Sequence, residues 1–251
     1  GSEGAFVKRM NEKAKQLGMK NTPFKNSCGL DIKGHETSAY DIALMSRELT
    51  TKHPDIFKYT KIWMDKFTHE TKKGTKEFGL SNTNKLLKQY NGCTGLKTGS
   101  TSTAKFCLSA TATRNGVSLI AVVMASDDSK TRVKDASALL DYGFSHCQVM
   151  EDHTKAKDIG KIAVTKGKKE TVSYQEDIPA KIVLVKGSKN DVKKQIRIGQ
   201  VKAPVKKGQV LGYIIYKRGD EVLLKKPVKA TESVEKMNFL TSLTRLAERY
   251  F

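Results

Sequence analysis

Asn91-Gly-Cys-Thr-Gly-Leu-Lys-Thr-Gly-Ser-Thr101 is the stretch on which the fold depends. Two runs rich in β-branched and apolar residues follow it, at residues 106–113 and 117–124, and such runs are typical of strands. Asn115-Gly116, between the two runs, is the pair that two-residue hairpin turns favour. The sequence therefore predicts two antiparallel strands after this stretch, and it places Lys97 near the end of the strand before them.

Lys97-Thr98-Gly99 is the part of the stretch that indicates chemistry. On a strand, this triplet offers a fixed cation, a hydroxyl and a backbone without a side chain that a substrate can approach closely. Lys-Thr-Gly is also the third signature of the penicillin-interactive serine enzymes, beside Ser-x-x-Lys and Ser-x-Asn. The triplet alone is weak evidence, because a chain rich in Lys can contain it by chance.

Sequence on both sides of the triplet resembles the D-alanyl-D-alanine carboxypeptidases of the peptidase S11 type, the low-molecular-mass penicillin-binding proteins. The resemblance covers nearly the whole chain. The similar segments are residues 1–3, 6–11, 14–24, 29–31, 37–44, 82–87, 95–101 and 203–212.

The resemblance implies an α+β protein with three parts. Residues 1–148 would form the C-terminal portion of a transpeptidase/β-lactamase-like domain, in which helices pack on an antiparallel sheet. Residues 149–232 would form a small β-sandwich, because they contain short alternating strands separated by Gly, Lys and Asp turns. Residues 233–251 would form an amphipathic helix.

Helical periodicity is expected in three other segments. Residues 1–20 carry apolar residues at helical spacing and end at Gly18, a plausible stop. Thr37-Ser38 can cap the next helix. Residues 129–144 predict a helix that packs on the sheet through Val133, Ala136, Leu139, Leu140 and Phe144. In the polar stretch 53–90, the expected packing anchors are Trp63 and Phe67.

The last segment, residues 233–251, has apolar and aromatic residues on one helical face and Arg, Ser and Glu on the other. Such a helix can lie in the plane of a membrane surface. The resemblance implies the same, since many of these carboxypeptidases end in an anchor on the extracytoplasmic face of the bacterial cell membrane. The alternative is a helix that packs on its own domain.

The family's nucleophile and general base are not found in the sequence. Ser-x-x-Lys occurs at Ser102/Lys105 and at Ser233/Lys236, and Ser-x-Asn occurs at Ser188-Lys-Asn190. The number of these matches does not exceed what chance predicts, and none of them lies where the family's motifs would lie. We therefore interpret all three as surface coincidences. With no signal peptide either, we expect an N-terminal truncation with the nucleophile upstream of residue 1, and we predict that the 251-residue chain alone is inactive.

The mechanism that the resemblance implies is removal of the terminal D-Ala from a peptidoglycan stem peptide through an acyl-serine intermediate. Lys97 would be catalytic, holding positive charge against the substrate. Thr98 and Ser100 would bind the terminal carboxylate, Gly99 would admit the peptide, and the Ser100 N–H would donate to the oxyanion. β-Lactam antibiotics would be inhibitors. The alternative is a non-catalytic relic of the same fold that binds cell wall or membrane.

Composition adds limits on partners. The formal net charge is +20, shared by both halves of the chain, with 23 basic and 14 acidic residues up to residue 147 and 23 and 12 after it. Such diffuse charge favours anionic lipid heads and wall polymers over nucleic acid, which would need a basic stripe with aromatics. The four Cys and five His show no metal-ligand spacing, so no cofactor and no metal are assigned.

Overall fold

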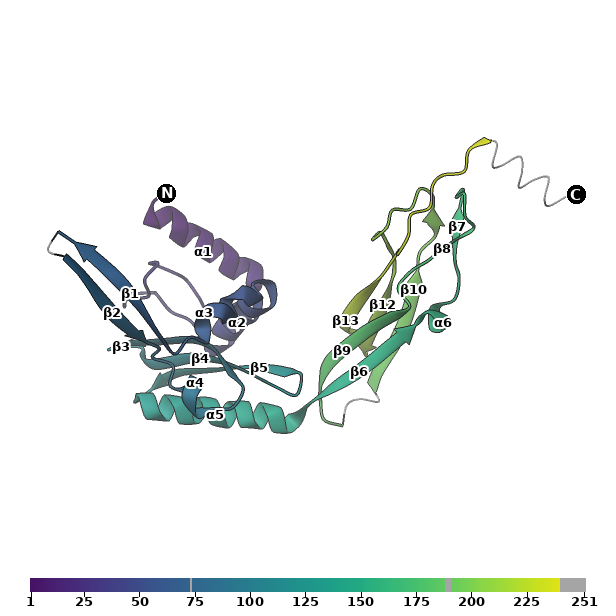
Figure 1. Cartoon of the computed structure of the whole chain (residues 1–251). Coiled ribbons are helices and arrows are strands. Elements are labelled where there is room, and N and C mark those ends of the chain that lie inside the picture. Colours follow the sequence, from purple (N-terminus) through teal and green to yellow (C-terminus); the bar gives the residue numbers. More distant parts are fainter. Residues whose placement is uncertain (73, 188–190, 240–251) are drawn as a thin grey trace, which may run out of the picture. The chain divides into compact units, whose positions relative to one another are not determined.

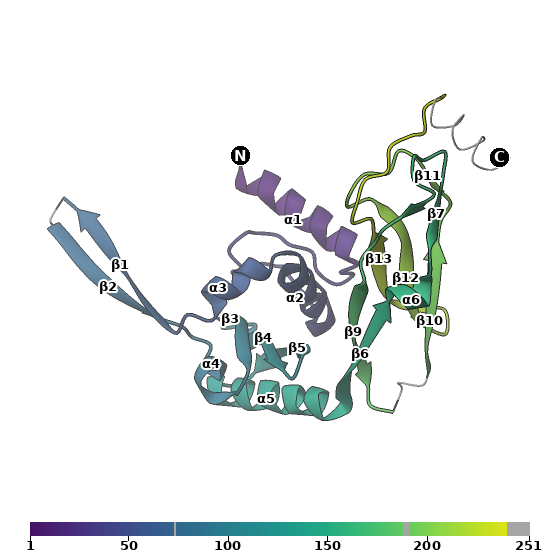
Figure 2. The same cartoon turned by 45° about the vertical axis from the view of Figure 1, so that its right-hand side comes forward.

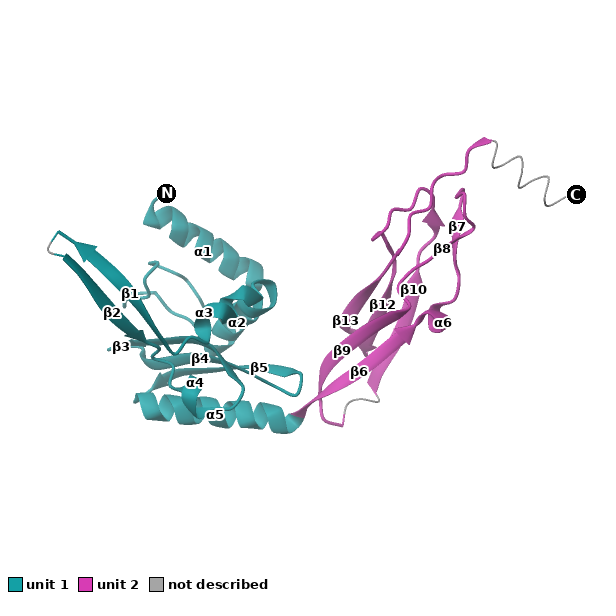
Figure 3. Cartoon of the chain, viewed as in Figure 1, with its two compact units in different colours: residues 1–146 teal, residues 147–251 magenta. Residues whose placement is uncertain are grey.

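The computed structural model describes residues 1–72, 74–187 and 191–239 (Figure 1). The chain divides into two compact units, residues 1–146 and 147–251 (Figure 3). Each unit has a hydrophobic core of its own. The sequence places the corresponding boundary at residue 148.

The first unit begins with two helices whose ends agree with the sequence. Helix α1 (Glu3–Leu17) stops at Gly18, which adopts the left-handed conformation (φ 75°). Helix α2 (Ala39–Lys52) starts at Ser38, whose hydroxyl accepts the Asp41 N–H at 3.2 Å. Both predicted helices are confirmed.

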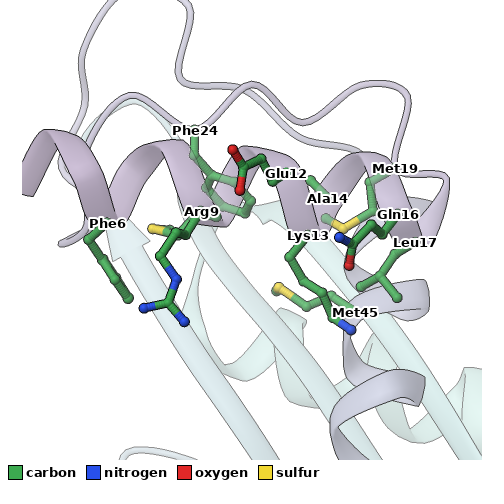
Figure 4. A pocket seen from close by; sticks show the side chains of 11 residues that line it. Phe6, Arg9, Glu12, Lys13, Ala14, Gln16, Leu17, Met19, Phe24 and Met45 are labelled. Carbon is green, nitrogen blue, oxygen red and sulfur yellow. The ribbon is translucent and has the colours of Figure 1, made fainter.

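The apolar face of α1 is only partly covered. Lys13 on α1 pairs with Glu48 on α2 at 2.8 Å. Beside this contact lies a hollow of about 450 Å³, and Phe6 and Met45 are among the side chains that face it (Figure 4). Ala14 is buried, whereas Phe6 is 52% exposed. Helix α1 therefore packs on the unit near Ala14, and the other end of its apolar face, at Phe6, remains exposed.

A long hairpin follows the short segments η1 (Pro54–Ile56) and α3 (Phe57–Thr60). Its strands β1 (Met64–Thr71) and β2 (Gly74–Ser81) project from the rest of the unit (Figures 1 and 2). The prediction that Phe67 is a packing anchor is wrong, since it is 47% exposed and stacks only on Phe78 across the hairpin, with ring centroids 5.6 Å apart. The reason is that no layer covers this two-stranded ribbon. Trp63, at its base, is half-buried.

The central sheet has the strand order β3-β4-β5 and is antiparallel. Its strands β3 (Cys93–Thr101), β4 (Lys105–Arg114) and β5 (Val117–Ser126) follow the short helix α4 (Leu86–Gln89). Asn115 and Gly116 both have positive φ, 49° and 78°, as the two-residue turn requires. The predicted hairpin is confirmed.

Helix α5 (Ser129–His146) covers one face of this sheet (Figure 1). Leu108 and Ala110 of β4 lie in the same core as Leu140 of α5. Because side chains alternate along a strand, Ser109 points to the other face, where its hydroxyl lies 2.7 Å from that of Ser46 on α2. The predicted packing of α5 is confirmed except at Leu139, which is 49% exposed.

Lys97 lies in the middle of β3, so its predicted position near a strand end is wrong. Lys97 pairs with Ser109, and the pairing continues until Thr101 meets Lys105. The strand extends beyond the triplet because the chain does not turn until residues 102–104.

The second unit contains three small sheets around a single core, which confirms the predicted β-sandwich class. The sheets are β6-β9, β11-β7-β8 and β10-β12-β13. Strand β6 was not expected from the sequence. The bounds are β6 (Cys147–Lys155), α6 (Ala156–Ile159), β7 (Ile162–Thr165), β8 (Thr171–Val172), β9 (Asp177–Val185), β10 (Val192–Ile198), β11 (Val201–Lys202), β12 (Val210–Arg218) and β13 (Glu221–Lys229).

A polar contact joins two of these sheets. The carboxylate of Asp152 on β6 accepts hydrogen bonds from Lys194 on β10 at 2.7 Å and from the hydroxyl of Tyr216 on β12 at 2.6 Å. Burial alone would raise the pKa of Asp152, but these hydrogen bonds hold it below its usual value. Burial, followed by the hydrogen bond to Asp152, raises the pKa of Tyr216 to about 12.

Residues 234–237 form a strap across the second unit. Val234, 1% exposed, exchanges backbone hydrogen bonds with Val205 at 2.8 and 2.9 Å, and the Met237 N–H donates to the Lys166 carbonyl at 2.9 Å. The prediction of a helix starting at residue 233 is therefore wrong for this strap, because Val234 belongs to the core. From residue 240 onward the predicted amphipathic helix lies outside the described residues.

Candidate active site

The Lys-Thr-Gly triplet lines a cleft of about 700 Å³ in the first unit. All of the predicted site residues, Lys97, Thr98, Gly99 and Ser100, border it. They lie on β3, an edge strand of the sheet, so one side of its backbone is not paired by another strand of that sheet. Along β3, Lys97, Gly99 and Ser100 are exposed and Thr98 is buried. An extended peptide could therefore lie along this edge.

Thr98 is fixed by the segment that precedes β3. Its hydroxyl lies 2.6 Å from the hydroxyl of Thr83. The neighbouring Asn82 accepts the Asn84 N–H at 2.9 Å and donates to the Ile62 carbonyl at 2.9 Å, which ties the segment to the base of the β1–β2 hairpin. The hydroxyl of Thr98 is thus held at the cleft wall by a hydrogen-bonded loop.

Lys97 is a cation without a carboxylate partner. Its ammonium donates to the Thr98 carbonyl, and it forms no ion pair with any residue that the structure describes. An uncompensated ammonium at the border of a cleft attracts anionic groups. The position therefore suits a ligand that carries a carboxylate.

Arg132 brings a second cation to the cleft, and sequence reasoning missed it. Its guanidinium donates to the carbonyl oxygens of Cys107 at 3.1 Å and Gly99 at 3.5 Å, and it lies over the Phe106 ring at 5.6 Å. The side chain is 4% exposed, and its Nε has no partner among the described residues. Burial lowers the pKa of Arg132, but a guanidinium stays charged in proteins.

The start of α5 positions Arg132. The carboxylate of Asp128 accepts the N–H groups of Lys130 at 2.6 Å and Thr131 at 2.8 Å, which fixes the first turn of the helix. Hydrogen bonds from Thr131 keep the pKa of Asp128 below its usual value. Nothing in the sequence marks Arg132, because its place beside Gly99 depends on how α5 packs against β3 and β4.

The loop before α2 forms another border of the cleft, at residues 28–30. Asp31 accepts hydrogen bonds from the Thr101 hydroxyl at 2.8 Å and from the Thr103 N–H at 3.3 Å. The bond from Thr101 is the main cause that lowers the pKa of Asp31. These contacts join the loop to the turn that follows the triplet.

The two Ser-x-x-Lys pairs do not form nucleophile and base. Ser102 is exposed in the β3–β4 turn, and the ammonium of Lys105 binds Asp127 at 2.6 Å. Ser233 is also exposed, and its hydroxyl accepts the Lys207 N–H at 3.0 Å. Both serines thus lie at the surface, as expected. Ser188-Lys-Asn190 lies outside the described residues.

Among the described residues, no cluster of three or more His, Cys, Asp and Glu side chains has the arrangement required to hold a metal ion. The thiols of Cys28, Cys93, Cys107 and Cys147 are all free.

Comparison with known proteins gives the family. The family profile described as D-alanyl-D-alanine carboxypeptidase, Peptidase S11, matches residues 1–128, which include the Lys-Thr-Gly strand. The chain belongs to the D-alanyl-D-alanine carboxypeptidase family. Residues 148–236 of the chain match a second profile, the C-terminal domain of penicillin-binding protein 5.

Curated relatives of the chain are longer than it is. D-alanyl-D-alanine carboxypeptidase DacF of Bacillus subtilis is 42% identical over 247 residues, which are 98% of this chain and 62% of DacF. DacA of Haemophilus influenzae is 32% identical over 84% of this chain and 53% of its own length. The chain thus spans between about half and three-fifths of these two carboxypeptidases.

Solved structures support the same α+β fold for this chain. Penicillin-binding protein 5 of Haemophilus influenzae superposes with a TM-score of 0.61 at 29% identity, covering 92% of this chain and 66% of that one. The Streptomyces K15 DD-transpeptidase gives a TM-score of 0.53 at 32% identity and covers 58% of each chain.

Proposed function

We propose that the chain is part of a serine-type D-alanyl-D-alanine carboxypeptidase that removes the terminal D-Ala of peptidoglycan stem peptides. The observation that carries the proposal is the Lys-Thr-Gly triplet on an edge strand that lines an open cleft, in a chain of this family. The unpaired ammonium of Lys97 and the guanidinium of Arg132 supply the positive charge that a C-terminal carboxylate requires.

Each site residue has a separate role in this proposal. The stem peptide lies along the free edge of β3, with Gly99 allowing close approach. The hydroxyls of Thr98 and Ser100 bind the terminal carboxylate. Lys97 holds positive charge near the reacting serine and helps to move its proton, and the Ser100 N–H donates to the developing oxyanion.

The acylating serine is proposed to lie outside residues 1–251. Support comes from the two Ser-x-x-Lys pairs, in which Lys105 is bound to Asp127 and the Ser233 hydroxyl is bound to the backbone of Lys207. In this proposal the chain supplies the substrate-binding wall, and β-lactam antibiotics acylate only a longer form that contains the serine.

The experiment that tests the function compares variants of the full-length protein. Lys97→Ala is expected to lower kcat/KM on an acyl-D-Ala-D-Ala peptide about 100-fold, the scale of losing an electrostatic group at the reacting centre. Lys105→Ala is the matched control, because Lys105 is exposed on the same sheet and pairs with Asp127 outside the cleft. Equal kinetics for wild type and Lys97→Ala would remove Lys97 from the mechanism.

Labelled penicillin separates the enzyme from the non-catalytic alternative. The full-length protein should acquire the label covalently, and residues 1–251 alone should not. A full-length protein that is folded and unlabelled would favour the relic that binds cell wall or membrane. A label on residues 1–251 alone would show that the nucleophile is within the chain, and Ser102 would be the first serine to replace.

A membrane location is part of the same proposal. Residues 239–251 would attach the protein to the anionic surface of the bacterial membrane, on its extracytoplasmic side, where peptidoglycan is found. The apolar face in the sequence of residues 239–251 supports this attachment. No helix of the described residues is long and apolar enough to cross a membrane.

A further inference from the structure

The outer face of the sheet β10-β12-β13 gathers cations. Ile196, Ile214 and Leu224 point into the core of the second unit, so the residues next to them in each strand point outward. The outward cations are Lys193, Arg197, Lys217, Lys225 and Lys229, and we call this surface the cationic face. Gln195, Tyr213 and Ile215 also point outward from this sheet, and all three are uncharged.

The cations of this face are not paired with carboxylates of the described residues. None of them forms an ion pair with a residue that the structure describes. The nearby carboxylates lie at one end of the sheet, where Glu221, the first residue of β13, is already bound to Arg218 at 2.9 Å and Asp191 and Asp220 are exposed. The middle of the cationic face and its opposite end, with Arg197 and Lys225, therefore carry only positive charge.

The sheet β6-β9 provides an internal comparison. Its outward cations all meet carboxylates across the strands. Lys181 pairs with Glu151 at 2.6 Å, and Lys155 pairs with Asp177 at 3.1 Å. Charge is thus balanced on one sheet of the unit and unbalanced on another. A high overall Lys content alone would not produce this difference.

The geometry favours a linear ligand. Cations occur on three adjacent strands, with Lys193 beside Lys217 and Arg197 beside Tyr213. Neighbouring strands lie about 5 Å apart, and outward residues of one strand about 7 Å apart. A flexible polymer with an anion on every short repeat unit can meet several of these cations in turn. The fork of Arg197 suits phosphate oxygens in particular.

Two details argue against other anionic partners. The ammonium of Lys225 lies 3.8 Å above the Tyr213 ring, so this ring face is occupied and cannot stack on a nucleic-acid base. Ile215, in the middle of the face, is 8% exposed, so the centre offers no apolar side chain for insertion into lipid. A polyanion without bases fits both details.

We propose that the cationic face binds a linear phosphodiester polymer of the polyol phosphate type. The site is separate from the Lys-Thr-Gly cleft and does not depend on catalysis. It also revises the expectation of diffuse charge, because folding brings together cations that are far apart in the sequence. The polymer would tether the second unit through several weak, salt-sensitive contacts.

The test measures binding of the 251-residue chain to fluorescently labelled poly(glycerol phosphate) between 50 and 200 mM salt. The face variant is Lys193→Gln, Arg197→Gln, Lys217→Gln and Lys225→Gln, because Gln removes the charge and keeps a long polar side chain. The matched control is Lys157→Gln, Lys161→Gln, Lys202→Gln and Lys206→Gln, which removes the same charge from exposed positions elsewhere in the unit.

The expected result follows from counterion release. Each cation in contact with a phosphate adds about 0.7 to the slope of log affinity against log salt. The face variant should have a slope about 3 shallower than wild type, which is a difference of about 50-fold over this salt range. The control variant should keep the wild-type slope. If the face variant does not fold, Arg197→Gln and Lys225→Gln alone should each reduce the slope by about 0.7.

Three results would overturn the proposal. Equal losses in the face and control variants would assign binding to overall charge. Tighter binding of duplex DNA than of poly(glycerol phosphate), lost in the face variant, would make nucleic acid the occupant. Binding to vesicles of anionic lipid that the face variant loses, with no binding of the soluble polymer, would make the membrane surface the occupant.

Discussion

Arg132 is a residue of the cleft that the sequence did not predict. The triplet Lys97-Thr98-Gly99 is visible because three consecutive residues carry the pattern. Arg132 stands alone on another element, in the first turn of a helix that was expected only to pack on the sheet. Its role depends on burial and on two carbonyl oxygens, Gly99 and Cys107, that belong to different strands. Such a cluster can be recognised only when the register of the sheet is known.

Arg132 gives a prediction at this scale. Arg132→Gln should weaken binding of an acyl-D-Ala-D-Ala peptide to the folded full-length protein about 10-fold or more, because a charge-assisted contact to the terminal carboxylate is lost. Binding of the same peptide with a C-terminal amide should change little. Isothermal titration of both peptides measures the difference.

The comparison variant is Arg114→Gln, since Arg114 is a half-buried cation of the same unit that does not border the cleft and lies over the Tyr90 and Phe144 rings. Equal weakening of the peptide and its amide by Arg132→Gln would mean that the residue only supports the fold of β3 and β4.

Individual elements followed the sequence where local chemistry decides them. Ser38 caps α2, Gly18 ends α1, and Asn115-Gly116 turns the hairpin, each through backbone geometry that a few residues determine. Elements that depend on distant partners did not follow it. Strand β6 contains the polar run Glu151-Asp-His153 and becomes a strand through its pairing with β9. Phe67 is aromatic, but it lies on the β1–β2 hairpin, which is not part of either core in the described residues.

Tyr216 gives a prediction at the scale of the sandwich. Tyr216→Phe removes the hydrogen bond to Asp152 and should destabilise the second unit by about 2 kcal/mol, the scale of a hydrogen bond to a charged group. Thermal unfolding measures the loss. Because Asp152 keeps Lys194, no unpaired carboxylate is created.

The same variant has a pH signature. The pKa of Tyr216 is raised from 10.0 to about 12, so the fold favours the neutral phenol. Its contribution to stability is complete below pH 10 and is lost as pH rises toward 12. Wild type should therefore lose more stability than Tyr216→Phe over this interval. Parallel curves for the two proteins would show that Tyr216 does not titrate differently in the folded state.

At the scale of the whole molecule, the sequence indicated a helical unit with a sheet and then a β-rich unit, and the structure has both. What it could not indicate is the distribution of charge over the second unit. The cations of the cationic face come from three strands between residues 192 and 229, so the linear sequence reads as diffuse charge. Because side chains alternate along each strand and the three strands are adjacent, these cations gather on one surface.

Membrane attachment is a prediction about the whole chain. Deleting residues 240–251 should release the protein from vesicles of anionic lipid and leave thermal unfolding unchanged, because the strap of residues 234–237 is kept. Leu243→Asp with Leu246→Asp should have the same effect. Cosedimentation with vesicles measures both. Binding that survives these changes and disappears at high salt would assign attachment to overall charge.

The strap has a consequence for how the protein is made. A ribosome delivers the chain from its N-terminus, and domains that are complete fold first. The second unit cannot be complete until Val234 reaches Val205 and Met237 reaches Lys166. Its core therefore closes only after residues 234–237 have left the ribosome, later than every strand from β6 to β13. A premature stop codon even slightly upstream would leave a polypeptide with an open β-rich core, a target for proteases and chaperones.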